Sequence, residues 1–172
     1  IRKFYSILKP DFLFYKRVNV LKMTNNIFQV DAFTTRLFGG NPAAVMTMAT
    51  FPADNVMQAL AAENNLAETA FIVGEAGEYQ LRWFTPTVEV PLCGHATLAS
   101  AAVVMERLEP GRTSVVFHTL SGSLHVRREG HAYVMDLPAY DPKALATPAG
   151  LEEALCIRLL EVLTYPGHLL AL

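Results

Sequence analysis

The stretch that contributes most to the predicted fold is LRWFTPTVEVPLCGHATLA, residues 81–99. Its first residues form a strand-like run, and Thr85-Pro86-Thr87 is a turn signal. Cys93-Gly94-His95 then opens an alanine-rich helix. Because a helix start presents unpaired backbone N–H groups and partial positive charge, it suits anion binding. We therefore expect a thiol and an imidazole beside a place that favours anionic ligands.

A carboxylate lies upstream in NNLAETAF, residues 64–71, where a predicted helix ends and a strand begins. This carboxylate belongs to Glu68. One acid and one imidazole at element ends are the groups that general acid–base chemistry requires. Glu68 and His95 are therefore the candidate proton-transfer residues.

Composition restricts the class of protein. The chain has 172 residues, with 52% hydrophobic and 17% charged residues, so it can bury a core and is not of the disordered type. Its length suggests one large domain or one and a half. The formal net charge of -2 gives no electrostatic reason to expect nucleic acid as a partner. No apolar run approaches the roughly 18 residues that span a bilayer, so we expect no membrane segment.

The cysteines and short motifs point away from cofactors. Cys93 and Cys156 are too few for a disulfide scaffold, and their spacing indicates neither a metal site nor a redox pair. A reducing, cytoplasmic location is the simplest interpretation. We find no glycine-rich nucleotide motif and no zinc-type spacing, and we therefore predict no cofactor and no metal.

Residues 1–22 differ from the rest of the chain. They are basic and contain several aromatic residues without a sustained period, and Met23 resembles a natural start. The segment lacks the apolar core of a secretory signal. We therefore interpret 1–22 as an extension outside the native fold.

The remaining sequence predicts an α+β protein. The helix over 94–108 is rich in small residues, which favours a central helix wrapped by sheet. A second helix should begin near Pro52 and end near Asn64-Asn65. A proline-rich linker over 138–148, a short helix over 151–155 and an apolar strand pattern over 159–172 follow. Strands are expected at 26–33, 43–48, 69–73, 79–84, 114–120, 123–128 and 132–137.

Five short motifs follow one another along the chain: QVDAFT (29–34), GNPAAV (40–45), NLAETAF (65–71), FTPTVEV (84–90) and CGHAT (93–97). Any one of them alone would be a weak signal. Together and in this order, they resemble the phenazine biosynthesis PhzF-like family over about residues 26–137.

The resemblance implies a diaminopimelate epimerase-like fold. In this family, two similar domains each curl a mostly antiparallel sheet around a central helix, and the active site lies between them. The chain would then consist of an N-terminal domain over 23–138, followed by a linker and an incomplete second domain over 139–172. Such proteins shift a proton along a dihydro-hydroxy-anthranilate ring without cofactor or metal.

The resemblance also implies roles for particular residues. Glu68 matches the catalytic glutamate, and His95 matches the active-site histidine. The substrate would be a small anionic molecule, cyclic or amino-acid-like, and the enzyme a homodimer. Substrate-binding positions carried over from the motifs are Asn41, Cys93, Gly94, Ala96 and Thr97.

Two departures and two alternatives accompany this prediction. Ala67 stands where the family usually has serine, and Pro91 stands where many members have aspartate. One alternative is a catalytically inactive half-protein that binds anions or associates with itself. The other is a cysteine-dependent epimerase that uses Cys93, although such epimerases need a second thiol.

Overall fold

The computed structural model describes residues 2–7, 13–20, 23–36, 38–137, 139, 141–165 and 167–172. The chain divides into two units, Ile1–Leu137 and Pro138–Leu172, which are described separately below. Within the described residues, no helix is long and apolar enough to cross a membrane.

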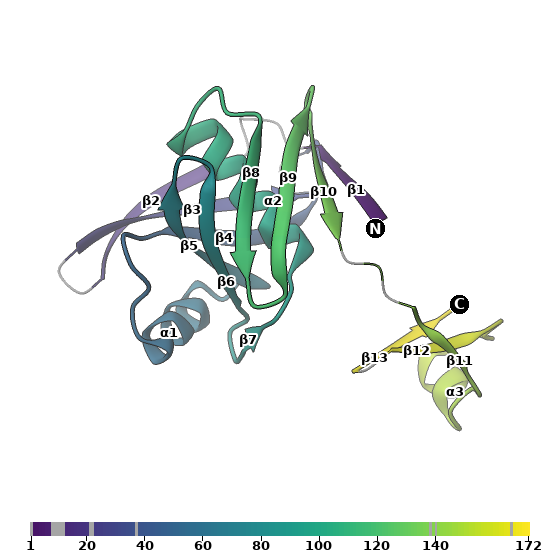
Figure 1. The fold of residues 1–172 in the computed structure, drawn as a ribbon. Coiled ribbons are helices and arrows are strands. Elements are labelled where there is room, and N and C mark those ends of the chain that lie inside the picture. The colour runs from purple at the N-terminus through teal and green to yellow at the C-terminus, as the bar shows by residue number, and fades with distance from the viewer. Residues whose placement is uncertain are drawn as a thin grey trace. The chain divides into compact units, whose positions relative to one another are not determined.

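The described strands of the first unit form one 10-stranded sheet. Its order is β1-β10-β9-β8-β6-β5-β4-β3-β2, with β7 paired to β6 (Figure 1). The strands are β1 (Arg2–Ile7), β2 (Leu13–Val20), β3 (Met23–Ala32), β4 (Asn41–Thr47), β5 (Glu68–Glu75), β6 (Glu78–Phe84), β7 (Glu89–Val90), β8 (Ser114–Thr119), β9 (Gly122–Glu129) and β10 (Ala132–Leu137).

Two parallel pairs interrupt this otherwise antiparallel sheet. β4 lies parallel to β5, and β6 lies parallel to β8. Parallel neighbours need a long crossover connection, which is usually a helix. Helix α1 (Asp54–Asn64) makes the first crossover, and helix α2 (Gly94–Val103) lies in the second. The predicted central helix and the predicted second helix are therefore the two crossovers.

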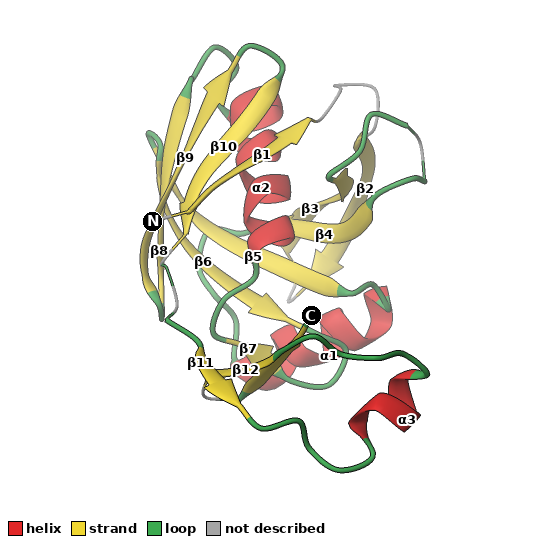
Figure 2. Ribbon diagram, turned by 90° about the vertical axis from the view of Figure 1, so that its right-hand side faces the viewer, coloured by secondary structure: helices red, strands yellow, loops and turns green. Residues whose placement is uncertain are grey.

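The two faces of the central strands pack against different helices. Successive residues of a strand point to opposite faces of the sheet. Val45 and Ile72 belong to the large core cluster that contains the residues of α2. Their neighbours Met46 and Phe71 belong to a smaller cluster that contains Met57 of α1. Figure 2 shows the result, with α2 inside the curled sheet and α1 outside it.

Helix α2 is buried at every residue from His95 to Val103. Its alanines let the surrounding strands approach closely, as the small-residue composition predicted. Its hydroxyl groups bond within the helix: Thr97 Oγ1 donates to the Cys93 carbonyl at 2.6 Å, and Ser100 Oγ donates to the Ala96 carbonyl at 2.7 Å. Such bonds satisfy polar groups that have no access to water. The predicted helix over 94–108 ends in a π-helical turn, η2 (Val104–Leu108).

Helix α1 begins and ends where the sequence predicted. It starts directly after Pro52 and Ala53, and Asn65 closes it in the left-handed conformation with φ 49° and ψ 38°. The Asn65 N–H donates to the Ala61 carbonyl at 3.2 Å. Met57 and Ala61 are its buried residues, so one side of α1 packs on the sheet and the rest faces solvent.

The segment 1–22 contributes two strands in the structure. β1 pairs antiparallel with β10, and β2 pairs antiparallel with β3. These two strands were not predicted from the sequence, because pairing at a sheet edge depends on the partner strand as much as on the local pattern. The predicted division of the chain at residues 22 and 138 stays a prediction.

The second unit contains a small antiparallel sheet with the order β11-β12-β13. Its elements are β11 (Lys143–Leu145), α3 (Leu151–Leu155), β12 (Val162–Tyr165) and β13 (His168–Ala171). The helix lies where it was predicted and buries none of its residues. β11 lies inside the segment that the sequence predicted as linker, and the predicted apolar strand pattern of 159–172 becomes a hairpin.

Candidate active site

Glu68 is the first residue of β5 and directly follows the end of α1. The parallel pairing of β5 with β4 places it opposite Ala43. Its side chain keeps 20% of its surface exposed. Glu68 therefore lies at the edge of the core, with part of its side chain open to solvent.

His95 brings its imidazole to this carboxylate from the first turn of α2. His95 Nε2 lies 3.1 Å from Glu68 Oε2, and the imidazole side chain is 9% exposed. Both atoms are out of contact with water, and neither has an aligned hydrogen-bond partner among the described residues. The two atoms therefore lie at hydrogen-bonding distance, but the angle between the groups is not that of a hydrogen bond. The structure brings the two candidate proton-transfer residues together.

Cys93 contacts the other side of the same imidazole. Its Sγ lies 3.4 Å from His95 Nδ1. Burial raises the pKa of Cys93 to about 12, and the Glu68 charge acts in the same direction. The sulfur is therefore a thiol at neutral pH and can donate to Nδ1. We assign the imidazole proton to Nε2, where it faces the carboxylate.

Burial also determines the charge state of His95. Desolvation lowers the pKa of His95, while the Glu68 charge and the Pro42 carbonyl act in the opposite direction. A charged imidazole loses more hydration on burial than a neutral one. The neutral ring is therefore favoured at neutral pH, and it can donate one hydrogen bond and accept one.

The predicted substrate-binding residues fall into two groups. Asn41 is exposed at the start of β4, next to the Pro42 carbonyl that interacts with His95, and Gly94 is partly buried. The side chains of Ala96 and Thr97 are fully buried. Any contact of these last two residues with a substrate would therefore involve main-chain atoms.

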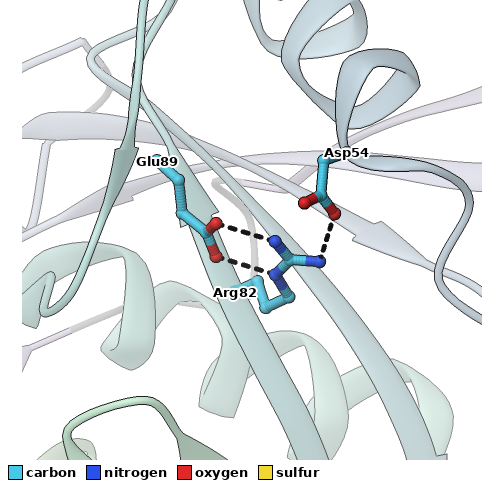
Figure 3. A network of polar contacts seen from close by, with 3 residues as sticks. All are labelled: Asp54, Arg82 and Glu89. Carbon is cyan, nitrogen blue, oxygen red and sulfur yellow. Dashed lines mark hydrogen bonds and ion pairs between the residues drawn. The ribbon is translucent and has the colours of Figure 1, made fainter.

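The sequence did not predict an ionic network that joins strand β6, helix α1 and strand β7. Figure 3 shows Arg82 of β6 between Asp54 of α1 and Glu89 of β7. Arg82 Nε and Nη2 each donate to Glu89 at 2.7 Å, and Nη1 donates to Asp54 at 2.8 Å. Glu89 was visible in the motif FTPTVEV, but its partners are distant in the sequence.

A second missed contact joins the same segments. Gln58 of α1 donates from Nε2 to the Thr85 carbonyl at 2.8 Å, in the turn that leads to β7. Farther along α1, Asn64 Nδ2 donates to Thr69 Oγ1 at 3.1 Å. Polar side chains of α1 thus connect this helix both to the turn before Cys93 and to the strand that begins at Glu68.

Comparison with known proteins identifies the family. A family model described as PhzC-PhzF, phenazine biosynthesis-like protein, matches residues 30–157. An uncharacterized isomerase of Pseudomonas aeruginosa is 54% identical over 147 residues, which are 86% of this chain and 57% of that protein. The chain therefore spans little more than half the length of this relative.

Two solved structures are similar to this chain in fold. A phenazine biosynthesis protein of the PhzF family from Enterococcus faecalis superposes with a TM-score of 0.78 at 39% identity, over 87% of this chain and 57% of that one. A predicted epimerase of Pseudomonas aeruginosa superposes with a TM-score of 0.62 at 28% identity, over 76% of this chain and 50% of that one.

The curled sheet around a buried helix places the first unit in the class of diaminopimelate epimerase-like folds, as the sequence predicted. Within that class, the chain belongs to the phenazine biosynthesis-like PhzC–PhzF family.

Proposed function

We propose that this chain carries the proton-transfer residues of a PhzF-like isomerase. The observation that supports this best is the 3.1 Å contact between Glu68 Oε2 and His95 Nε2 at the edge of the core. The relative that is named an isomerase is 54% identical to this chain over 147 residues. This length includes the elements that carry Glu68 and His95. Glu68 would act as base and acid, and His95 would act as its partner.

The reaction moves one proton and needs no external reductant or oxidant. The Glu68 carboxylate takes a proton from one carbon of the substrate, and the C–H electron pair passes into the adjoining π system. The O–H bond of Glu68 then delivers the proton to a second carbon of that system. The neutral His95 ring, with its proton on Nε2, would stabilise the Glu68 carboxylate before the first step and after the second.

The proposed substrate is a small anion, cyclic or amino-acid-like. Its carboxylate would bind at the start of α2, where backbone N–H groups and the helix dipole favour negative charge. Asn41 and Gly94, which are accessible near this end of the helix, are the proposed contacts.

A cysteine-dependent epimerase receives less support. The contact between Cys93 and His95 favours it, because a thiol beside an imidazole is a usual activated pair. Burial nevertheless raises the pKa of Cys93 to about 12, which keeps the thiol protonated. Glu68 is the better base.

Self-association stays a prediction, both as a homodimer of the isomerase and as the alternative of an inactive half-protein. The feature that favours it is the apolar surface of the second unit. Its exposed large residues include Leu160, Leu169, Leu170 and Leu172.

Glu68→Gln tests the proposed function. Small cyclic and amino-acid carboxylates, with a dihydro-hydroxy-anthranilate first, are incubated with the protein in deuterated water, and deuterium incorporation is followed by NMR. Loss of the base should reduce exchange by roughly 10²–10⁴-fold. Glu63→Gln is the matched control, because Glu63 is an exposed carboxylate on α1. Exchange in Glu68→Gln at the unmodified rate would contradict the assignment.

A further inference from the structure

Three different donor groups converge at the proposed active site. One donor atom each from Glu68, Cys93 and His95 lie within 4.8 Å of one another. They come from the start of β5 and from the start of α2, which are separate in the sequence. A carboxylate, a thiol and an imidazole together form the kind of mixed ligand set that zinc accepts.

The carboxylate donor has no aligned partner. Glu68 Oε2 is buried and makes no hydrogen bond to any described residue. Buried polar atoms in native structures are usually satisfied, so this oxygen calls for an explanation. A bound cation would satisfy the carboxylate directly.

The spacing of sulfur and nitrogen fits a tetrahedral metal. With Zn–S of about 2.3 Å and Zn–N of about 2.0 Å, the tetrahedral angle separates the two ligand atoms by about 3.5 Å. Cys93 Sγ and His95 Nδ1 are 3.4 Å apart. The Glu68 carboxylate must move from the Nε2 side towards the metal, and its partly exposed side chain leaves room for this rotation.

We infer that Cys93, His95 and Glu68 form a three-ligand site for a zinc-like transition metal, and that bound metal inhibits the enzyme. Binding replaces the thiol proton by the metal, and this proton passes to solvent. The metal then holds the carboxylate lone pair that would accept the substrate proton. The inhibitory consequence rests on the proposed function, whereas the metal site itself does not.

The choice of metal follows from the donors. Thiolate and imidazole favour zinc and related transition metals, whereas magnesium and calcium prefer sites made of oxygen atoms. With three protein ligands, a fourth position stays open to water or to a substrate carboxylate. This site was not predicted from the sequence, because Glu68 is distant from the Cys93-Gly94-His95 triplet and joins it only in the fold.

Cobalt titration tests the site directly. The chain is prepared without an affinity tag, stripped with a chelator and carries Cys156→Ser, which removes the exposed thiol. Added Co²⁺ should produce a thiolate-to-cobalt charge-transfer band that saturates at one equivalent, and Zn²⁺ should abolish the band. Adding Cys93→Ser should remove it. Glu68→Gln should weaken binding by at least the roughly 10–100-fold that loss of an outer-shell partner costs.

Control variants test whether the metal binds at the proposed site. Glu63→Gln should bind Co²⁺ like the unmodified chain, and circular dichroism checks that Cys93→Ser is folded. Absence of the band in the Cys156→Ser chain, an unchanged band after Cys93→Ser, or unaltered affinity after Glu68→Gln would overturn the site. If Cys93→Ser does not fold, the Glu68→Gln result decides.

Deuterium exchange is then compared in chelated and zinc-saturated protein. At least tenfold slower exchange with zinc bound is the expected result. Full exchange with zinc bound would overturn the inhibition. A cobalt band in a chain that shows no exchange would leave the site standing and contradict the proposed isomerase.

Discussion

The two crossover helices of the first unit are held in place in different ways. α2 lies inside the curled sheet and is buried from His95 to Val103, so close packing on all sides fixes it. α1 lies outside the sheet, buries Met57 and Ala61, and is connected by polar side chains such as Gln58. Helix α2 carries His95, and helix α1 leads to Glu68.

The difference concerns how firmly each residue is positioned. His95 belongs to the enclosed helix, and its side chain is 9% exposed. Glu68 follows the outer helix, and its side chain is 20% exposed. In the proposed acid–base site, the packed helix would supply a fixed imidazole, and the polar-anchored helix would lead to a carboxylate that can follow the substrate between two carbons.

Enlarging a small residue of the enclosed helix should have the largest effect on stability. Ala99 is fully buried, and Ala99→Leu must displace strands that already contact the helix. Overpacking of this kind costs about 3 kcal/mol of unfolding free energy. Ala59→Leu, at an exposed position of α1, should change it by less than about 0.5 kcal/mol. Urea unfolding measures both, and equal losses would show that the two helices do not differ in packing.

Removing the ionic network should loosen the outer helix selectively. Arg82→Met deletes three hydrogen bonds to carboxylates and leaves Asp54 and Glu89 without their cation. We expect a loss of about 2 kcal/mol. Hydrogen exchange should accelerate at the amides of α1 while those of α2 stay protected.

Arg127→Met is the matched control for this change. Arg127 forms a more exposed ion pair with Glu129 on β9, for which we expect a loss of about 0.5 kcal/mol or less. If Arg82→Met accelerated exchange equally in both helices, the network would stabilise the unit as a whole and not the outer helix in particular.

The contrast between the helices was partly predictable from the sequence. The alanine-rich composition of 94–108 predicted an enclosed helix, because small residues on every face allow close approach. The apolar spacing after Pro52 and the pair Asn64-Asn65 predicted the bounds of α1. Both signals are local, and local signals survive in the fold when tertiary contacts reinforce them.

Long-range contacts escaped prediction. Asp54, Arg82 and Glu89 lie on three elements, and no sequence pattern indicated that one guanidinium joins them. The strands β1 and β7 were missed because their pairing with β10 and β6 depends on partners elsewhere in the chain. The pairing of Glu68 with His95 was expected from the family motifs, whereas the place of Cys93 on the other side of the ring was not.

The smallest expected effect is the contribution of His95 to the pH dependence of the unfolding free energy. Burial lowers the pKa of His95 below its ordinary value of about 6.5 in the folded state. Below about pH 6.5 the unfolded chain binds a proton on this ring that the folded chain does not bind. The free energy of unfolding should therefore fall as the pH drops from 7.5 to 5.5. His95→Gln should make this decrease smaller.

The comparison isolates His95 because the groups that face its ring are known. They are the Glu68 carboxylate, the Cys93 thiol and the Pro42 carbonyl. Cys93 keeps its proton from pH 7.5 to 5.5, because burial raises its pKa to about 12. If His95→Gln keeps the full decrease, the folded protein binds the His95 proton as readily as the unfolded chain. The imidazole then takes up and releases protons freely in the folded state, and the division between a fixed neutral partner and a mobile carboxylate fails.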